Sequence, residues 1–110
     1  MKLLELVKYF RDGHSFEEFC QTYSLDLQSE VIKIYMEQPL KIDNELAFFE
    51  IEKTEGNIEY EYEYKNIKYS NLFDFYYFLD AIEESKNAKN HSLSNEQLTK
   101  LLFNYAINDA

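Results

Sequence analysis

The sequence predicts an α+β fold, in which three helices precede and two helices follow a central antiparallel hairpin or three-stranded meander. Apolar residues recur at helical spacing near both ends of the chain, and a run in the middle alternates residue by residue. Only two glycines and one proline interrupt the 110 residues, which favours long regular elements joined by short turns. The length fits one domain over residues 1–110.

The first helix is expected from residue 3 to about residue 12, because apolar residues there repeat every three or four positions. Gly13 follows where a left-handed C-terminal cap is expected. A second, short helix begins after Ser15, the predicted N-cap, and Glu18 stands three residues later to complete a capping box. The expected buried residues of the two helices are Leu3, Leu6, Val7 and Phe10, then Phe16, Phe19, Cys20 and Tyr23.

A third helix is predicted over residues 27–37, and Pro39 would end it. Its apolar positions at helical spacing are Leu27, Val31, Ile34 and Tyr35. Residues 40–46 stay open between strand and loop.

Two strands are predicted in the middle of the chain, over residues 46–53 and 58–64, with a turn at 54–57. The second strand alternates Glu and Tyr without error, which is the strongest strand pattern in the sequence. We expect these two strands to pair as a hairpin. A further turn at Lys65-Asn66 would lead into a very short strand over residues 67–69.

The fourth helix is predicted after an N-cap at Ser70 or Asn71, and residues 85–92 are predicted to be a surface linker. The last helix begins at a capping box formed by Ser94 and Gln97. The expected buried stripes are Leu72, Phe75, Tyr76, Leu79 and Ile82 in the fourth helix, and Leu98, Leu101, Leu102, Tyr105 and Ala106 in the last.

The net charge of −10, from 21 acidic and 11 basic residues, limits the kinds of partner. Such a field repels phosphate backbones and anionic membranes, and it attracts basic proteins. We therefore expect a basic protein partner, no nucleic acid and no membrane. A plainer interpretation is solubility, because a net charge far from zero keeps any small protein dispersed.

The Glu/Tyr run suggests where such a partner would bind. Glu59, Glu61 and Glu63 lie about 7 Å apart along one face of a strand, with tyrosines on the other face. Like charges on a paired strand cost stability, so a surface that keeps them is suited to a cationic partner. The alternative is a solvated face that protects a tyrosine-rich edge from aggregation. The predicted partner-binding residues are Glu50, Glu52, Glu55, Glu59, Glu61, Glu63, Tyr60 and Tyr62.

No catalytic, cofactor or metal site is expected. The single cysteine, Cys20, shares an apolar face with Phe16 and Phe19, and His14 belongs to a capped turn, so a thiol–imidazole pair is disfavoured. Gly13 and Gly56 are too far apart for a phosphate loop, and evenly spaced glutamates do not converge on one cation. With no signal peptide or membrane span in the sequence, a reducing, cytoplasmic location is expected.

A helix-turn-helix reader of DNA is also disfavoured, since the predicted recognition segment 27–37 carries Lys33 as its one basic residue. Short, acidic and rich in aromatic residues, the chain resembles the small bacterial immunity proteins that neutralise a cognate toxin, often a nuclease. The resemblance implies a non-enzymatic binding protein whose partner is a toxin domain. Two alternatives stay open: a phage-encoded inhibitor with a DNA-like acidic face, and a homo-oligomeric structural or assembly module.

Overall fold

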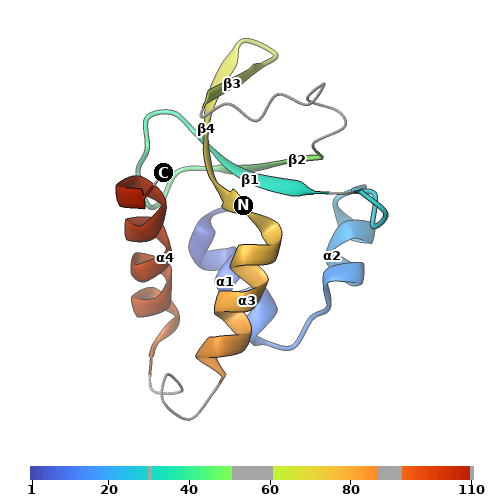
Figure 1. Cartoon of the computed structure of the whole chain (residues 1–110), viewed down its shortest axis with the longest axis vertical. Helices are drawn as coiled ribbons and strands as arrows, with labels where there is room; N and C mark the ends of the chain where they lie inside the picture. The colour runs from blue at the N-terminus through green and yellow to red at the C-terminus, as the bar shows by residue number, and fades with distance from the viewer. Residues whose placement is uncertain (30, 51–60, 87–92, 110) are drawn as a thin grey trace.

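A computed structural model describes residues 1–29, 31–50, 61–86 and 93–109, and it confirms the predicted α+β class. The described helices gather on one side of a four-stranded antiparallel sheet, below it in Figure 1. The elements in chain order are α1 (Leu3–Arg11), α2 (Phe16–Thr22), β1 (Ile32–Glu37), β2 (Leu46–Glu50), β3 (Glu61–Tyr64), β4 (Ile67–Asp74), α3 (Phe75–Ser85) and α4 (Asn95–Asp109).

The ends of the predicted helices are confirmed where side chains satisfy backbone groups. Gly13 has a φ of +100° just after α1, and its N–H donates to the carbonyl of Phe10 at 3.2 Å. The hydroxyl of Ser15 accepts the N–H of Glu18 at 3.1 Å and so caps α2. Before α4, Gln97 Oε1 accepts the N–H of Ser94 at 2.8 Å and Ser94 Oγ accepts the N–H of Gln97 at 3.0 Å.

The helix predicted over residues 27–37 is wrong, because β1 occupies Ile32–Glu37. Ile32, Ile34 and Met36 face the core between the sheet and the helices, while Tyr35 is buried on the opposite face. A strand that is buried on both faces has a nearly continuous run of apolar residues, and such a run also contains apolar residues at helical spacing by coincidence. The run includes β-branched residues, so the strand is favoured over the helix once both of its edges are paired.

The strand order β2-β1-β4-β3 corrects the predicted hairpin between the two middle strands. β1 pairs with β2 on one edge and with β4 on the other, so β2 and β3 are the two outer strands of the sheet. Of the predicted strands, residues 51–53 and 58–60 and the turn at 54–57 lie outside the described residues. The hairpin that does form joins β3 to β4.

The β3–β4 hairpin turns at Lys65 and Asn66, as predicted, with φ values of 51° and 69°. Two consecutive positive φ angles are typical of the type I′ turn, whose twist matches that of the flanking strands. The strand that follows is longer than the predicted 67–69 and includes a bulge at Leu72, because Tyr35 pairs with Asn71 whereas Ile34 pairs with Phe73.

The longer β4 also corrects the predicted start of the next helix. Neither Ser70 nor Asn71 is the N-cap, since both lie within the strand, and α3 begins after Asp74. The Asp74 carboxylate makes no cap hydrogen bond and instead forms an ion pair with Lys33 on β1. α3 extends through Ser85, the first residue of the predicted linker, and residues 87–92 of that linker lie outside the described residues.

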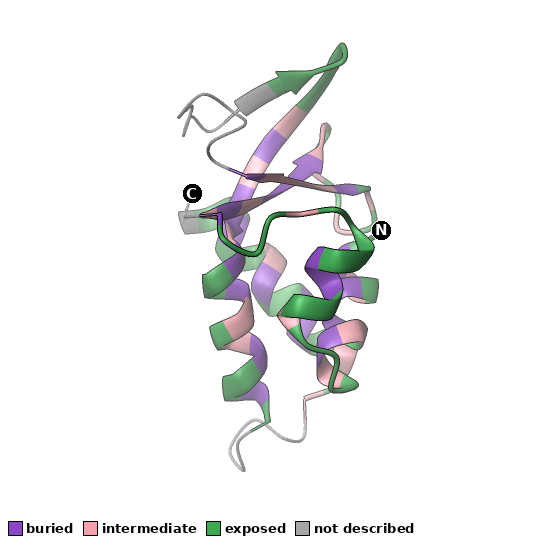
Figure 2. Cartoon of the chain, turned by 90° about the vertical axis from the view of Figure 1, so that its right-hand side faces the viewer, coloured by how far each residue is buried: buried purple, intermediate pink, exposed green. Residues whose placement is uncertain are grey.

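Phe75 occupies the centre of the core between the sheet and the helices. Its ring centroid lies 4.9–5.8 Å from those of five other phenylalanines, on α1, α2, β2 and α3 itself. Edge-to-face and tilted contacts at this range add to the free energy gained by burying apolar area. The five phenylalanines around Phe75 are Phe10, Phe16, Phe19, Phe48 and Phe78. The buried sides of the helices accordingly face inward beneath the sheet (Figure 2).

A second aromatic cluster lies on the face of the sheet that turns away from the helices. Phe49 of β2 packs its ring 5.3 Å from Tyr35, 5.5 Å from Tyr64 and 5.4 Å from Tyr69. In a flat sheet β2 and β3 would stand three strand spacings apart, about 14 Å. The contact between Phe49 and Tyr64 therefore shows that the sheet is strongly curled.

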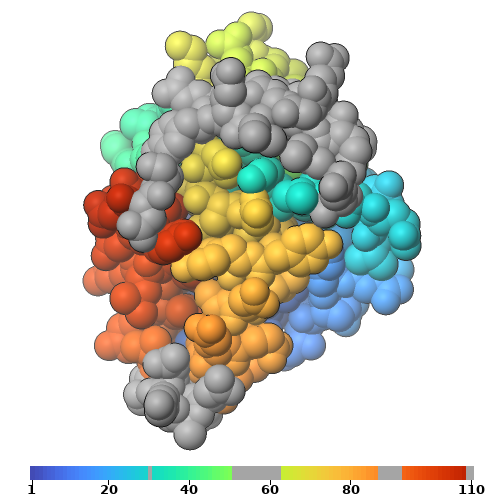
Figure 3. Space-filling model, viewed as in Figure 1, coloured from blue at the N-terminus to red at the C-terminus, as the bar shows by residue number. Residues whose placement is uncertain are grey.

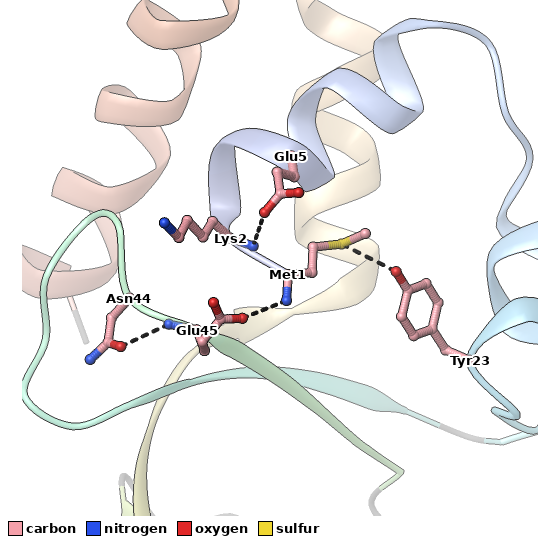
Figure 4. Close-up of polar contacts among 6 residues, drawn as sticks. All are labelled: Met1, Lys2, Glu5, Tyr23, Asn44 and Glu45. Carbon is pink, nitrogen blue, oxygen red and sulfur yellow. Dashed lines mark hydrogen bonds and ion pairs between the residues drawn. The ribbon is translucent and has the colours of Figure 1, made fainter.

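The first residues of the chain are held at the sheet edge, as Figure 4 shows. The amino group of Met1 forms an ion pair with Glu45 Oε2 at 2.6 Å, and the carbonyl of Met1 accepts the N–H of Leu46 at 2.8 Å. The backbones of Lys2 and Glu45 also pair as an isolated antiparallel β-bridge. These contacts position the start of α1 beside β2.

We expect Phe75→Ala to lower the free energy of unfolding by about 3–5 kcal/mol, because it removes the ring at the centre of the core and leaves a cavity. Urea unfolding followed by circular dichroism measures this. Tyr76→Ala is the matched control, since Tyr76 is the next residue on α3 and is 50% exposed. Equal losses in the two variants would contradict the central position of Phe75.

Candidate functional site

The predicted glutamate surface is only partly within the described residues. Glu52, Glu55, Glu59 and Tyr60 lie outside them, and Glu61 and Tyr62 belong to β3. The exposed Glu63 is paired across the hairpin with Lys68, so its cross-strand neighbour carries the opposite charge. Among the described residues, β2 and β3 are not neighbours in the sheet, so Glu50 does not lie across from Glu61 or Glu63.

Glu50 is buried, with 4% of its surface exposed. Its Oε1 accepts the backbone N–H of Asp26 at 2.7 Å, which joins the end of β2 to the loop after α2. A buried carboxylate needs such hydrogen bonds to offset its lost hydration. In this structure Glu50 therefore holds a loop in place and is not on an exposed acidic face.

Exposed large apolar side chains lie on both sides of the contact between α3 and α4. Leu101 and Tyr105, which the sequence assigned to a buried stripe, are 55% and 40% exposed, and Tyr77 is 37% exposed. The rings of Tyr77 and Tyr105 stack in parallel, with centroids 4.4 Å apart and an angle of 14° between their planes. We call the surface formed by Tyr77, Leu101 and Tyr105 the tyrosine face. Tyr76, another predicted stripe residue, is 50% exposed, and its ring lies 6.3 Å from that of Phe16 on α2.

A groove of about 180 Å³ runs between the two helices at this face. α3 contributes Tyr77, Ala81 and Glu84, and α4 contributes Leu98, Leu101 and Leu102. Leu98 and Leu102 are buried and form the floor, whereas Leu101 projects at the rim. In Figure 3 the two helices lie side by side on the surface turned toward the viewer.

Carboxylates lie beside the tyrosine face on α3. Asp80, Glu83 and Glu84 are all exposed there, and Lys86 lies 3.7 Å from Glu83. An apolar aromatic centre with a charged rim is the usual anatomy of a protein-binding surface, in which the centre provides most of the contact energy. The arrangement is suited to a partner that carries apolar and basic side chains.

The two helices are held apart because both rest on α1, which packs against each of them. Arg11, at the end of α1, donates from Nη1 to the carbonyl of Leu93 at 2.9 Å and to Asn95 Oδ1 at 3.0 Å. These bonds fix the beginning of α4 relative to α1. The position of α1 behind the pair leaves the groove open on the outer side.

The sequence contains a signal that Tyr76 is exposed, although it is in the predicted buried stripe. Tyr76, Asp80 and Glu83 repeat at i, i+4 and i+7, and polar groups in such a row are typical of an exposed helix face. In the structure the buried face of α3 is formed by Phe75, Phe78 and Ile82. In α4 the exposed fractions of Leu101 and Tyr105 depend on the distance to α3, which sequence does not give.

The structure places Cys20 and His14, the thiol and imidazole considered as a catalytic pair, in different environments. Cys20 is 2% exposed within the core, and burial, with the carboxylates of Glu50 and Asp26, raises the pKa of its thiol. His14 is exposed, stacks on Tyr9 at 4.3 Å and contacts Glu18 Oε2 through Nδ1 at 3.2 Å. A protonated, buried thiol is a poor nucleophile.

Among the described residues, no helix has the length and apolarity to cross a membrane. In the same part of the chain, no three side chains of His, Cys, Asp or Glu are grouped so that they could hold a metal ion. Comparisons of the chain with protein-family models, curated proteins and solved structures found no match.

We expect Arg11→Met to speed amide hydrogen exchange in the first turn of α4 and to lower the unfolding free energy by about 1–2 kcal/mol, because two hydrogen bonds from a charged donor are lost while the apolar stem is kept. Hydrogen exchange followed by NMR measures the first effect. Lys8→Met, at an exposed site on α1, is the control. The same exchange rates in both variants would show that Arg11 does not hold α4.

The Cys20 thiol should react with a disulfide reagent at pH 8 at least about 100-fold more slowly in the folded protein than in guanidinium, since reaction requires opening of the core. The rate of thiolate release measures this. A variant that combines Cys20→Ser with Gln21→Cys moves the thiol to the adjacent exposed position of α2 and should react fast in both states. A folded-state rate equal to that of this control would contradict the burial of Cys20.

Proposed function

We propose that the chain is a non-enzymatic binding protein that neutralises a basic partner protein, as the small immunity proteins do with bacterial toxins. The observation that carries the proposal is the tyrosine face, an exposed apolar surface with carboxylates beside it on a chain of net charge −10. Charge provides attraction at a distance, and tyrosine and leucine side chains provide contact energy after docking.

The proposed mechanism is occupation of a basic surface that the partner needs for its own activity. A nuclease, for example, must present a cationic cleft to phosphate, and a carboxylate-rich surface can fill that cleft. Electrostatic steering raises the association rate, which matters for a protein that must reach its target before the target acts. The glutamate run that includes Glu59, Glu61 and Glu63 stays a second proposed contact, because its charge would act in the same direction.

We expect the tagged full-length chain to capture a basic protein from a lysate of its source organism at low salt and to release it at high salt. Mass spectrometry identifies the captured protein. The purified chain should then inhibit that protein's activity, for instance the cleavage of plasmid DNA by a nuclease. Recovery of the bait alone, or a captured protein whose activity is unchanged by an excess of the chain, would refute the proposed function.

Charge-matched variants test which surface acts in this capture. One replaces the carboxylates of α3 near the tyrosine face (Asp80→Asn, Glu83→Gln, Glu84→Gln), and the other replaces three exposed carboxylates outside α3 (Glu17→Gln, Asp43→Asn, Glu96→Gln). Each removes three charges and changes the net charge from −10 to −7. We expect the first variant to lose more affinity than the second. Equal losses would indicate that total charge, and not this face, determines binding.

A further inference from the structure

The size of the groove between α3 and α4 limits what can occupy it. At about 180 Å³ it is smaller than the roughly 300–1,000 Å³ of pockets that enclose a small-molecule ligand. The buried residues of its lining are Leu98, Leu102 and Ser85, whose hydroxyl already donates to the carbonyl of Ile82, and the rim at Leu101 is half exposed. A groove of this size and chemistry accepts one or two apolar side chains that project from a larger partner.

The groove is elongated along α3. On α3 its lining extends from Tyr77 through Ala81 to Glu84, seven residues apart, which is about 10 Å or two helical turns. Helix-in-groove recognition uses anchors at i, i+4 and i+7 on the incoming helix, and two neighbouring anchors of such a row fit within this length. The groove therefore suits one or two residues from the apolar row of a single amphipathic helix.

The carboxylates beside the groove favour an incoming helix that carries basic side chains. Asp80 and Glu84 stand one turn apart on α3, next to the groove, and together with Glu83 they would attract basic side chains beside the apolar anchors. A second copy of this chain fits poorly, because it would bring another net charge of −10 to the contact. Its α3 contains no Lys or Arg and its α4 contains only Lys100.

We infer that the groove between α3 and α4 is the docking site for a basic amphipathic helix of the partner protein. This inference rests on the proposed function and gives it a contact geometry. Apolar side chains of the incoming helix enter between Leu101 and Ala81, above the floor. Its Lys or Arg side chains lie against Glu84 and Asp80, and the stacked pair of Tyr77 and Tyr105 contacts its apolar face.

A synthetic peptide tests the geometry without knowledge of the natural partner. The probe is a helical peptide of about 18 residues, long enough to be helix-prone, with Leu at i, i+4 and i+7, Lys elsewhere and one Trp. The chain contains no Trp, so Trp fluorescence reports the peptide alone. A second peptide of the same composition, with its leucines scattered around the helix, has the same charge but no apolar face.

We expect saturable binding of the amphipathic peptide to the full-length chain, at least about tenfold tighter than that of the scattered peptide. Leu101→Glu should weaken binding of the amphipathic peptide at least tenfold. Leu27→Glu, at another leucine that is 43% exposed, adds the same charge and should change binding less than twofold. Leu101→Ser provides a second variant without added charge, and circular dichroism confirms that each variant is folded.

Equal affinity for the two peptides, or equal effects of Leu101→Glu and Leu27→Glu, would overturn the inference, because binding would then be adsorption to a negatively charged surface. A natural partner whose capture is unaffected by Leu101→Glu would also overturn it, while leaving the proposed function intact. The proposed function fails separately, when no basic protein is captured and inhibited. Sedimentation could instead show a dimer at low micromolar concentration that Leu101→Glu dissociates. This result would overturn the inference, because the occupant of the groove would then be a second copy of the chain.

Discussion

Backbone pairing along both edges of β1 is the constraint on which the rest of the structure depends. β1 hydrogen-bonds to β2 on one side and to β4 on the other, so it occupies the middle of the sheet. Ile34 faces the core between the sheet and the helices, and Tyr35 is buried on the opposite face of the sheet beside Phe49. A strand with both edges paired and both faces covered cannot change register without exposing apolar side chains, and this fixes the positions of its neighbours.

The helix layer follows from that sheet. β4 leads directly into α3 at Asp74, whose ion pair with Lys33 lies beside the point where strand becomes helix. Phe75 then enters the core immediately, so the direction in which α3 leaves the sheet is set within one residue. α4 is positioned by α1 and by the hydrogen bonds of Arg11. α3 and α4 both pack against α1 and β4, and a groove lies between the two helices.

In the proposed complex, the tyrosine face and the net charge would act at different distances. The field of a chain with net charge −10 extends to roughly the Debye length, about 10 Å at 0.1 M salt, and would bring a basic partner to the surface. Contact with Leu101 and with the stacked pair of Tyr77 and Tyr105 would then slow dissociation, since apolar burial persists at high salt. Acidic charge is spread over many elements, whereas this apolar surface is confined to two helices, and we therefore propose that it provides the specificity.

The sequence by itself determined the features that depend on neighbouring residues. The caps at Ser15 and Ser94, the left-handed Gly13 and the turn at Lys65-Asn66 could be predicted because their hydrogen bonds and φ angles are local. The tertiary structure decided that residues 32–37 form a strand, because one of its two pairing partners, β4, is distant in sequence. It also decided which side chains of α3 and α4 are exposed, because the width of a buried helix stripe is set by the helices packed against it.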